Sequence, residues 1–290
     1  STMYLVSNQR KIFNIFNSVL FAIAALIVII PFMNVLAVSF SKEADVIKST
    51  YMLIPPRFTL EAYIQVFSTK TLYGAIFNGL KLVLIAAPST ILCTTMAAYV
   101  LMYKKMFGVK LLSQLIIIAM VFDPGVVPTY ILLKDLGLVG KYAGLVFLGL
   151  INSWNIIYVK NFFYTIPSSL PESARIDGAS ELRIFRVIVL PLVKPIIAVL
   201  ALWNIIGNWN AYTPFLFYIP DPAKWPLQPV LREIVLNNNS QMQDSTVSGT
   251  IFGKNVAMVC MVISAIPVLI IYPYIQKYFM RGIMLGAVKG

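Results

Sequence analysis

The sequence predicts an all-α polytopic membrane protein with six transmembrane helices, folded as a single domain over residues 1–290. Of the 290 residues, 59% are hydrophobic and 12% are charged, and the mean hydropathy is +0.82. A soluble domain carries about 25% charged residues, so this chain has too few polar groups to cover its apolar surface. Long stretches without charge locate the helices, because about 20 apolar residues cross the hydrocarbon core of a bilayer.

Five uninterrupted charge-free stretches, 18 to 30 residues long, predict five of the spans. A sixth stretch, 111–133, is interrupted only by Asp123. The second span begins before Lys81, because the long side chain of a lysine can reach the membrane surface. We therefore expect helices near residues 12–40, 76–103, 110–133, 142–165, 193–217 and 254–280.

The distribution of lysine and arginine predicts that both termini are cytoplasmic. Thirteen of the 23 Lys and Arg residues fall on the side that holds the termini, the loop after the second span and residues 160–194. Lys and Arg near the ends of spans favour the cytoplasmic side, and an even number of spans returns the chain to it. Two long outer loops remain, 41–74 and 218–253. Each is expected to be either a docking surface for an external partner or an interfacial loop with aromatic anchors.

Composition excludes several kinds of chemistry. The chain has no histidine, and its two cysteines, Cys93 and Cys260, lie in apolar stretches. Histidine-based catalysis, Cys/His metal sites and a disulfide framework are therefore not expected. The phosphate-binding pattern Gly-x-x-x-x-Gly-Lys-Ser/Thr is absent, so any ATP must be bound by another chain. The net charge of +12 comes from residues that flank the spans, which favours contact with lipids over nucleic acid.

Polar residues within the predicted spans are candidates for a substrate pathway. Asp123 would cost about 2.5–3.5 kcal/mol at the centre of a lipid-facing helix. The following Pro124-Gly125 indicates a broken helix beside a cavity. Amide and indole side chains suit sugars, because amides exchange hydrogen bonds with hydroxyls and flat rings cover C–H faces, although Asn also joins membrane helices. The candidate pathway residues are Asp123, Asn152, Trp154, Asn155, Asn204, Asn208, Trp209, Asn210 and Tyr212.

A polar loop at residues 167–191 separates two of the spans. Pro171 and Glu172 favour a helix start, and Asp177-Gly178 predicts a break, since glycine tolerates a positive φ. A second helix is expected from about Ser180 to just before Pro191. Its apolar stripe is expected to contain Leu182, Phe185, Ile188 and Val189. From these residues alone, a docking element and an amphipathic loop on the lipid headgroups are equally supported.

The spacing within the 167–191 loop resembles a known motif. Glu172-Ser173-Ala174 is followed after three residues by Gly178, and after nine more by Ile188-x-Leu190-Pro191. This spacing resembles the EAA motif of the permease subunits of ABC importers, in which Ser173 would replace an alanine. Further similarity extends along most of the chain and is typical of the MalG/LplC-like oligosaccharide permeases, with the permease of alginate importers among them. It includes Gly125–Tyr130, Leu136-Gly137-Leu138, Asn161-Phe162-Phe163, Ala174–Ala179, Trp209-Asn210, Trp225–Gln228, Lys277–Phe279 and Gly286–Gly290.

The resemblance implies a MetI-like permease fold and a transporter subunit of the bacterial cytoplasmic (inner) membrane, not an enzyme. Its implied partners are a second permease subunit, two ATPase subunits that bind ATP and Mg²⁺, an extracytoplasmic solute-binding protein, membrane lipids and an oligosaccharide such as an alginate fragment. The 167–191 loop would be a cytoplasmic coupling loop held by an ATPase, and 281–290 a cytoplasmic tail. The implied ATPase-coupling residues are Glu172, Ser173, Ala174, Arg175, Asp177, Gly178, Phe185, Ile188, Leu190 and Pro191.

Other functions fit the sequence less well. Half of an ion-driven secondary transporter would need a buried ion site and internal symmetry, whereas this chain has one isolated intramembrane Asp and no evident repeat. An intramembrane enzyme would need histidine or a close pair of carboxylates, and a scaffold would not need the 167–191 loop. An ABC permease for a solute other than a sugar remains compatible with the motif.

Overall fold

The computed structural model describes residues 8–49, 51–239 and 253–287 of the chain. In these ranges the regular elements are helices, and the one extended pairing is an isolated antiparallel bridge between Ser41 and Phe58. The predicted all-α class is therefore confirmed for this part of the chain. The described residues divide into two compact units. The first contains those up to Thr69 and those from Ile234 to Ile263, and the second contains the remainder.

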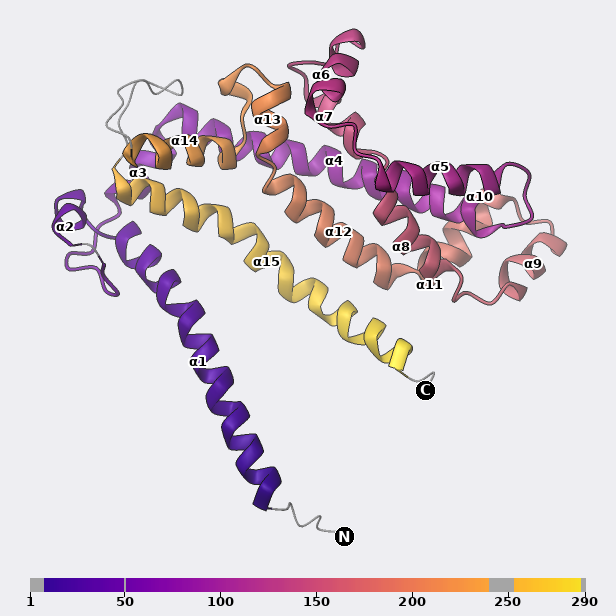
Figure 1. Cartoon of the computed structure of the whole chain (residues 1–290), viewed down its shortest axis with the longest axis horizontal. Coiled ribbons are helices and arrows are strands. Elements are labelled where there is room, and N and C mark those ends of the chain that lie inside the picture. Colours follow the sequence, from indigo (N-terminus) through magenta and orange to yellow (C-terminus); the bar gives the residue numbers. More distant parts are fainter. Residues whose placement is uncertain (1–7, 50, 240–252, 288–290) are drawn as a thin grey trace. The chain divides into compact units, whose positions relative to one another are not determined.

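Figure 1 labels the helices, which are numbered in chain order. The first unit contains α1 (Asn8–Ser39), α2 (Glu43–Lys48) and α3 (Glu61–Ser68). The second contains α4 (Lys70–Met102), α5 (Val109–Val121), α6 (Val126–Asp135), α7 (Tyr142–Gly149), α8 (Ser153–Phe163), α9 (Ser169–Ile176), α10 (Glu181–Arg183), the π-helix η1 (Ile184–Val189), α11 (Leu190–Leu192), α12 (Lys194–Trp209), α13 (Thr213–Tyr218) and the 3₁₀ helix η2 (Pro222–Lys224). The helices α14 (Leu227–Asn239) and α15 (Lys254–Ala287) contribute to both units.

In the first unit, the segment after α1 folds back on itself. The Arg57 guanidinium donates to both carboxylate oxygens of Asp45, at 2.9 and 2.6 Å. The ring of Phe40 stacks on Phe58 at 5.1 Å and on Tyr63 at 4.9 Å between ring centroids. These contacts give the described part of the predicted 41–74 loop a defined structure. Whether it is a docking surface or a membrane anchor stays a prediction.

In the second unit, α4 is the central helix, with α7, α8 and α12 packed against it (Figure 1). α4 and α12 approach closely at Gly79, where an added Cβ would lie 3.1 Å from the Trp209 ring. The Trp209 indole donates a 2.8 Å hydrogen bond to the Ser264 carbonyl of α15. Thr90 of α4 donates to the Gly149 carbonyl at the end of α7, at 2.9 Å. These contacts make α4 the helix through which the second unit is held together.

The described helices only partly match the six predicted spans. α1, α4 and the stretch of α15 up to Pro273 are long and apolar enough to cross a membrane, and two bent pairs, α7–α8 and α10–α12, raise the count to as many as five. The predicted 110–133 span is instead α5 and α6, separated by a break at residues 122–125. At 1.5 Å per residue, the 13 residues of α5 extend about 20 Å, which is shorter than a hydrocarbon core of about 30 Å. The six-span topology therefore stays a prediction.

Candidate functional site

The first half of the 167–191 loop is α9 followed by a glycine turn. Pro171 and Glu172 lie in the first turn of α9, where a carboxylate favours the positive end of the helix dipole. The Gly178 and Ala179 amides then donate to the carbonyls of Arg175 and Ala174, at 3.0 and 2.9 Å. This is the Schellman pattern, in which the residue after the helix takes a left-handed conformation. Gly178 has φ +78° with open space around it, so its backbone conformation requires glycine and the surrounding packing does not.

The second half of the loop differs from its prediction. Within it, residues 184–189 form a π-helix, whose i→i+5 hydrogen bonds change the face that each side chain takes. Ile184 is therefore fully buried, whereas Leu182, expected in the apolar stripe, is 52% exposed. The expected end before Pro191 was also wrong, because α11 includes this proline in its first turn. The chain instead bends by 82° between Leu192 and Lys194 and continues as α12.

Apart from Arg175, which is half-buried, the predicted coupling residues separate into two groups in the structure. One group is packed: Phe185 is buried, and Ala174, Ile188 and Leu190 lie against a core that includes Phe163 and Val189. The other group is exposed and lies on α9, on its glycine turn and at the far end of the loop. Its members are Glu172, Ser173, Asp177, Gly178 and Pro191, and Ile176, which the sequence analysis missed, is 87% exposed beside them. The loop is thus packed against the core through one set of residues, while Glu172, Asp177 and Ile176 are exposed.

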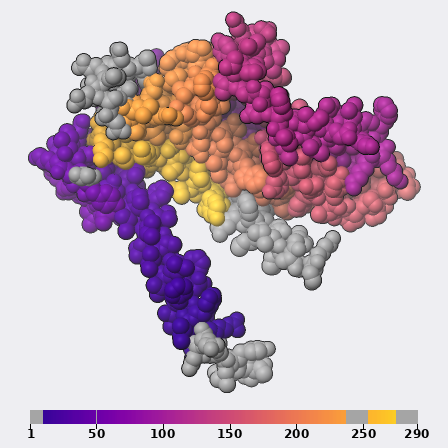
Figure 2. Space-filling model, viewed as in Figure 1, coloured from indigo at the N-terminus to yellow at the C-terminus, as the bar shows by residue number. Residues whose placement is uncertain are grey.

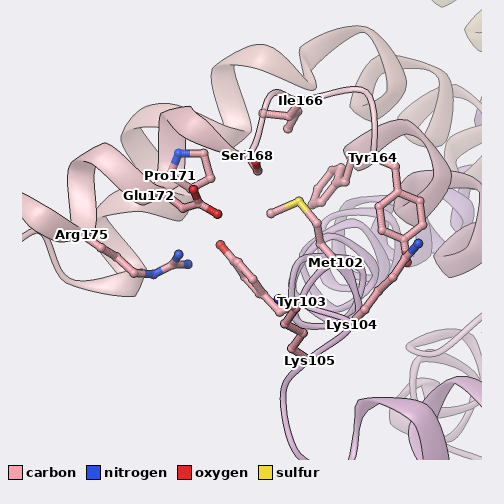
Figure 3. A pocket seen from close by; sticks show the side chains of 11 residues that line it. Met102, Tyr103, Lys104, Lys105, Tyr164, Ile166, Ser168, Pro171, Glu172 and Arg175 are labelled. Atoms are coloured by element: carbon pink, nitrogen blue, oxygen red, sulfur yellow. The ribbon is translucent and has the colours of Figure 1, made fainter.

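The stretch from α8 to α11 forms an outer end of the second unit in the view of Figure 2. A cavity of about 320 Å³ lies between α9 and the end of α4. Figure 3 shows the Glu172 carboxylate and the Tyr103 hydroxyl directed into it. Among the described residues, none forms a hydrogen bond or ion pair with the Glu172 carboxylate. This negative charge is therefore available to a cationic group of a partner.

A polar cluster of four residues, Tyr99, Tyr103, Arg175 and Glu181, joins the loop to α4. The Tyr99 hydroxyl donates to Glu181 Oε2 at 2.6 Å, and the Tyr103 hydroxyl donates to that of Tyr99 at 2.9 Å. Arg175 donates to both Glu181 oxygens, through Nε and through Nη2, the latter at 3.2 Å. Hydrogen bonds from Arg175 and then Tyr99 lower the pKa of Glu181 below its ordinary value, which keeps this carboxylate charged.

Tyr99, Tyr103 and Glu181 were not among the site residues predicted from the sequence. An available signal was the i, i+4 spacing of the two tyrosines at the polar end of a predicted span, which places both rings on one face of a helix. Within the described ranges, no group of three or more His, Cys, Asp or Glu residues is gathered as a metal site would need.

Most of the candidate pathway residues have local partners. Asn152 caps α8 by accepting from the Asn155 amide at 3.0 Å. Asn204 and Asn208 each donate to the carbonyl four residues earlier in α12, at 2.8 Å. The Asp123 carboxylate accepts from the Gly125 amide at 2.9 Å and so closes the turn between α5 and α6. Trp154 is 59% exposed, and among the described residues no hydrogen bond holds its indole.

A smaller group at the end of α12 combines polar and aromatic side chains. Asn210 Oδ1 accepts from Gln228 Nε2 at 3.0 Å. The Arg232 guanidinium lies 4.3 Å from the centroid of the Tyr212 ring. Arg232 is exposed, and within the described ranges no carboxylate pairs with it. The structure therefore brings two candidate pathway residues, Asn210 and Tyr212, together with an amide, Gln228, and a guanidinium, Arg232, that were not predicted from the sequence.

Comparison with known proteins identifies the family. Residues 9–284 match the model of the binding-protein-dependent transport system inner membrane component. The chain is 39% identical over 269 residues to the polygalacturonan/rhamnogalacturonan transport system permease protein YtcP of Bacillus subtilis (strain 168), covering 92% of this chain and 94% of YtcP. It is 37% identical over 282 residues to the protein LplC of the same organism, covering 97% and 96%. A crystal structure of a bacterial ABC transporter involved in the import of the acidic polysaccharide alginate contains a similar chain, with a TM-score of 0.86, 29% identity and coverage of 96% of this chain and 100% of that one.

Proposed function

The chain belongs to the family of binding-protein-dependent transport system inner membrane components, and from this premise we propose that it is the permease of an ABC importer for oligosaccharides. It acts as a transporter subunit in the bacterial cytoplasmic membrane, with six spans and both termini in the cytoplasm. A second permease, two ATPase subunits that carry ATP and Mg²⁺, and an extracytoplasmic binding protein complete the importer. The family description, which names a binding-protein-dependent system, favours this reading over an ion-driven secondary transporter.

The observation that carries the coupling proposal is the division of the 167–191 loop into packed and exposed residues. Phe185 and its neighbours fix the loop to the core, and Glu172, Ile176 and Asp177 stand outside it. In our proposal an ATPase binds this exposed face. Movement of the ATPases on binding ATP displaces α9, and the continuous α10–η1–α11 segment carries the displacement to α12.

The substrate proposal is an acidic oligosaccharide. YtcP is named for polygalacturonan and rhamnogalacturonan, and the similar structure is that of a transporter involved in the import of alginate, an acidic polysaccharide. The group at the end of α12 suits such a ligand, because a guanidinium binds carboxylates bidentately and amides bind hydroxyls. Tyr212, stacked with Arg232, offers a flat apolar ring for a sugar face.

Glu172→Gln tests the coupling proposal. We expect this isosteric change to lower the melting temperature of the chain only slightly, because the carboxylate has no hydrogen-bond or ion-pair partner among the described residues and contributes about 0.3–1 kcal/mol through the helix dipole. Recovery of the ATPase subunits with the permease should fall about tenfold, since hydrogen bonds to charged groups contribute about 1.5–3 kcal/mol.

The matched control is Glu61→Gln, which removes another exposed carboxylate, paired with Lys42 at 3.4 Å outside the 167–191 loop. It should retain full recovery of the ATPases. Wild-type recovery with Glu172→Gln, or equal losses in both variants, would show that the exposed face of α9 does not bind the ATPase.

A further inference from the structure

The polar cluster connects two consecutive elements of the loop, α9 and α10, to α4, which lies far from them in the chain. Arg175 lies on α9, Glu181 begins α10, and Tyr99 and Tyr103 lie at the end of α4. Glu181 accepts from both directions, from the guanidinium on one side and from the Tyr99 hydroxyl on the other. It is therefore the point at which the two halves of the 167–191 loop and α4 meet.

Aromatic rings pack against the polar groups of the cluster. The Arg175 guanidinium lies 4.7 Å from the centroid of the Tyr103 ring, within the range of a cation–π interaction. The Tyr99 ring packs edge-on against Tyr103, with 5.3 Å between ring centroids, and at a tilt against Phe185 of η1, with 5.0 Å between centroids. Tyr99 is only 8% exposed, so its hydroxyl meets Glu181 at the edge of a packed core and not in open solvent. Tyr99 thus both packs against the core of the second unit and hydrogen-bonds to Glu181.

The position of the cluster matters because of the glycine turn. Gly178 lies between Arg175 and Glu181, and a glycine alone would let α9 swing relative to α10. The bidentate Arg175–Glu181 ion pair joins α9 to α10 across this turn and so restricts movement of one helix relative to the other. A displacement of α9 is therefore passed on through Glu181 rather than absorbed at Gly178.

We propose that the cluster is a second attachment of the 167–191 loop, through which its displacement reaches α4 directly as well as α12 along the chain. Tyr99 and Glu181 are positioning residues: they touch no substrate and hold the loop to the central helix of the second unit. This inference rests on the proposed coupling function. It adds that coupling depends on a tyrosine hydroxyl outside the loop.

The test uses the complete importer, purified with its partner subunits and placed in liposomes. The readout is the ratio of ATP hydrolysis with and without a binding protein loaded with oligogalacturonate. Tyr99→Phe removes only the hydroxyl, and Glu181→Gln removes the charge. Both should lower this ratio at least about threefold, because a lost hydrogen bond to a charged group exceeds that factor, while the ATPases still co-purify.

The matched control is Thr90→Val, which removes another hydrogen bond of α4, to the Gly149 carbonyl, away from the loop. If its ratio falls as far as that of Tyr99→Phe, general loosening of α4 explains the loss, and the attachment is rejected. A wild-type ratio in Tyr99→Phe rejects it as well.

Failure of the proposed function is recognised separately, since the wild-type importer would then show no stimulation at all. In that case a thermal double-mutant cycle tests the attachment alone. If Tyr99→Phe and Glu181→Gln act through one contact, the double variant should melt close to the worse single variant. Additive losses would overturn the attachment.

Discussion

At the scale of single residues, the charged groups of the 167–191 loop have separate tasks. Glu172 is exposed and unpaired within the described chain, whereas Glu181 is held by Arg175 and Tyr99. The lowered pKa of Glu181 means that its contribution to stability is present above its ordinary pKa of 4.5 and is lost as pH falls through the lower folded value. At neutral pH the cluster is therefore intact, and Glu172 remains the carboxylate that a partner can reach.

Arg232 allows the proposed substrate charge to be tested at one residue. Arg232→Gln keeps a long polar side chain but removes the bidentate cation, so it should raise the substrate concentration for half-maximal uptake of oligogalacturonate by about tenfold or more. Uptake of the same oligosaccharides with their carboxylates reduced to alcohols should not change. The measurement is uptake into liposomes that contain the importer.

A control with an equal loss of charge is Arg57→Gln, whose guanidinium is paired with Asp45 in the first unit. It should leave the concentration dependence as in the wild type. Equal effects of Arg232→Gln on charged and reduced oligosaccharides would assign Arg232 to the packing of Tyr212 and not to substrate charge.

Residue-level prediction from sequence succeeded where a role depends on local backbone chemistry. Asp177-Gly178 predicted a turn, and Gly178 has the positive φ that a glycine permits. It did not find Tyr99 or Glu181, because their role comes from a contact between residues 82 positions apart in the chain. Asn204 and Asn208 were predicted as pathway residues from their residue type alone. In the structure their side chains hydrogen-bond to carbonyls four residues earlier in the same helix, which gives no evidence of a pathway.

At the scale of elements, charge-free runs located the apolar helices but not their internal breaks. α4 begins at Lys70, six residues before the expected start, and Leu72 and Ala75 of this added stretch are buried. Asn78, further along the helix, donates to the Ala223 and Trp225 carbonyls at 3.0 and 3.2 Å. Such a tertiary contact gives a polar residue a place in a long helix and leaves no mark in hydropathy. The π-helix, in which Ile184 and Val189 are fully buried, was not predicted either, because a hydrophobic periodicity of 3.6 residues does not distinguish it from an α-helix.

The contact between α4 and α12 yields an element-scale prediction. A leucine at Gly79 would have to displace the Trp209 ring, whose nearest atom is 3.1 Å from the added Cβ. Overpacking of this kind costs about 1–3 kcal/mol, so Gly79→Leu should lower the melting temperature in detergent. Gly74→Leu in the same helix has nothing within 4 Å of its Cβ and gains the same helix propensity. Equal melting temperatures for the two variants would contradict close packing of α12 on α4 at Gly79.

At the scale of the whole molecule, composition and motif predicted the class of protein better than its topology. The all-helical, MetI-like permease fold is confirmed by the family match and by the 0.86 TM-score with the structure from the alginate importer. The number of membrane crossings is harder to predict, because the mean hydropathy of a segment does not show whether the helix is broken within it. Residues 109–135 contain enough apolar side chains for a span, yet they form two helices with an exposed Asp123 between them.

Cysteine labelling from each side of the membrane tests the six-span topology. In a chain with Cys93 and Cys260 replaced by serine, a membrane-impermeant maleimide should label Ile54→Cys and Leu136→Cys in intact cells, and Ile176→Cys only after permeabilisation. The three positions are 76%, 51% and 87% exposed, so access to the reagent is comparable. Leu136 decides the count, because it follows α6 and reaches the outer face only if α5 and α6 cross together. Labelling of Leu136→Cys only in permeabilised cells would make α5–α6 a re-entrant segment and reject the six-span topology. Ile176→Cys labelled in intact cells would then mean an odd number of crossings and separated termini, whereas Ile176→Cys still protected would mean that α7–α8 does not cross either.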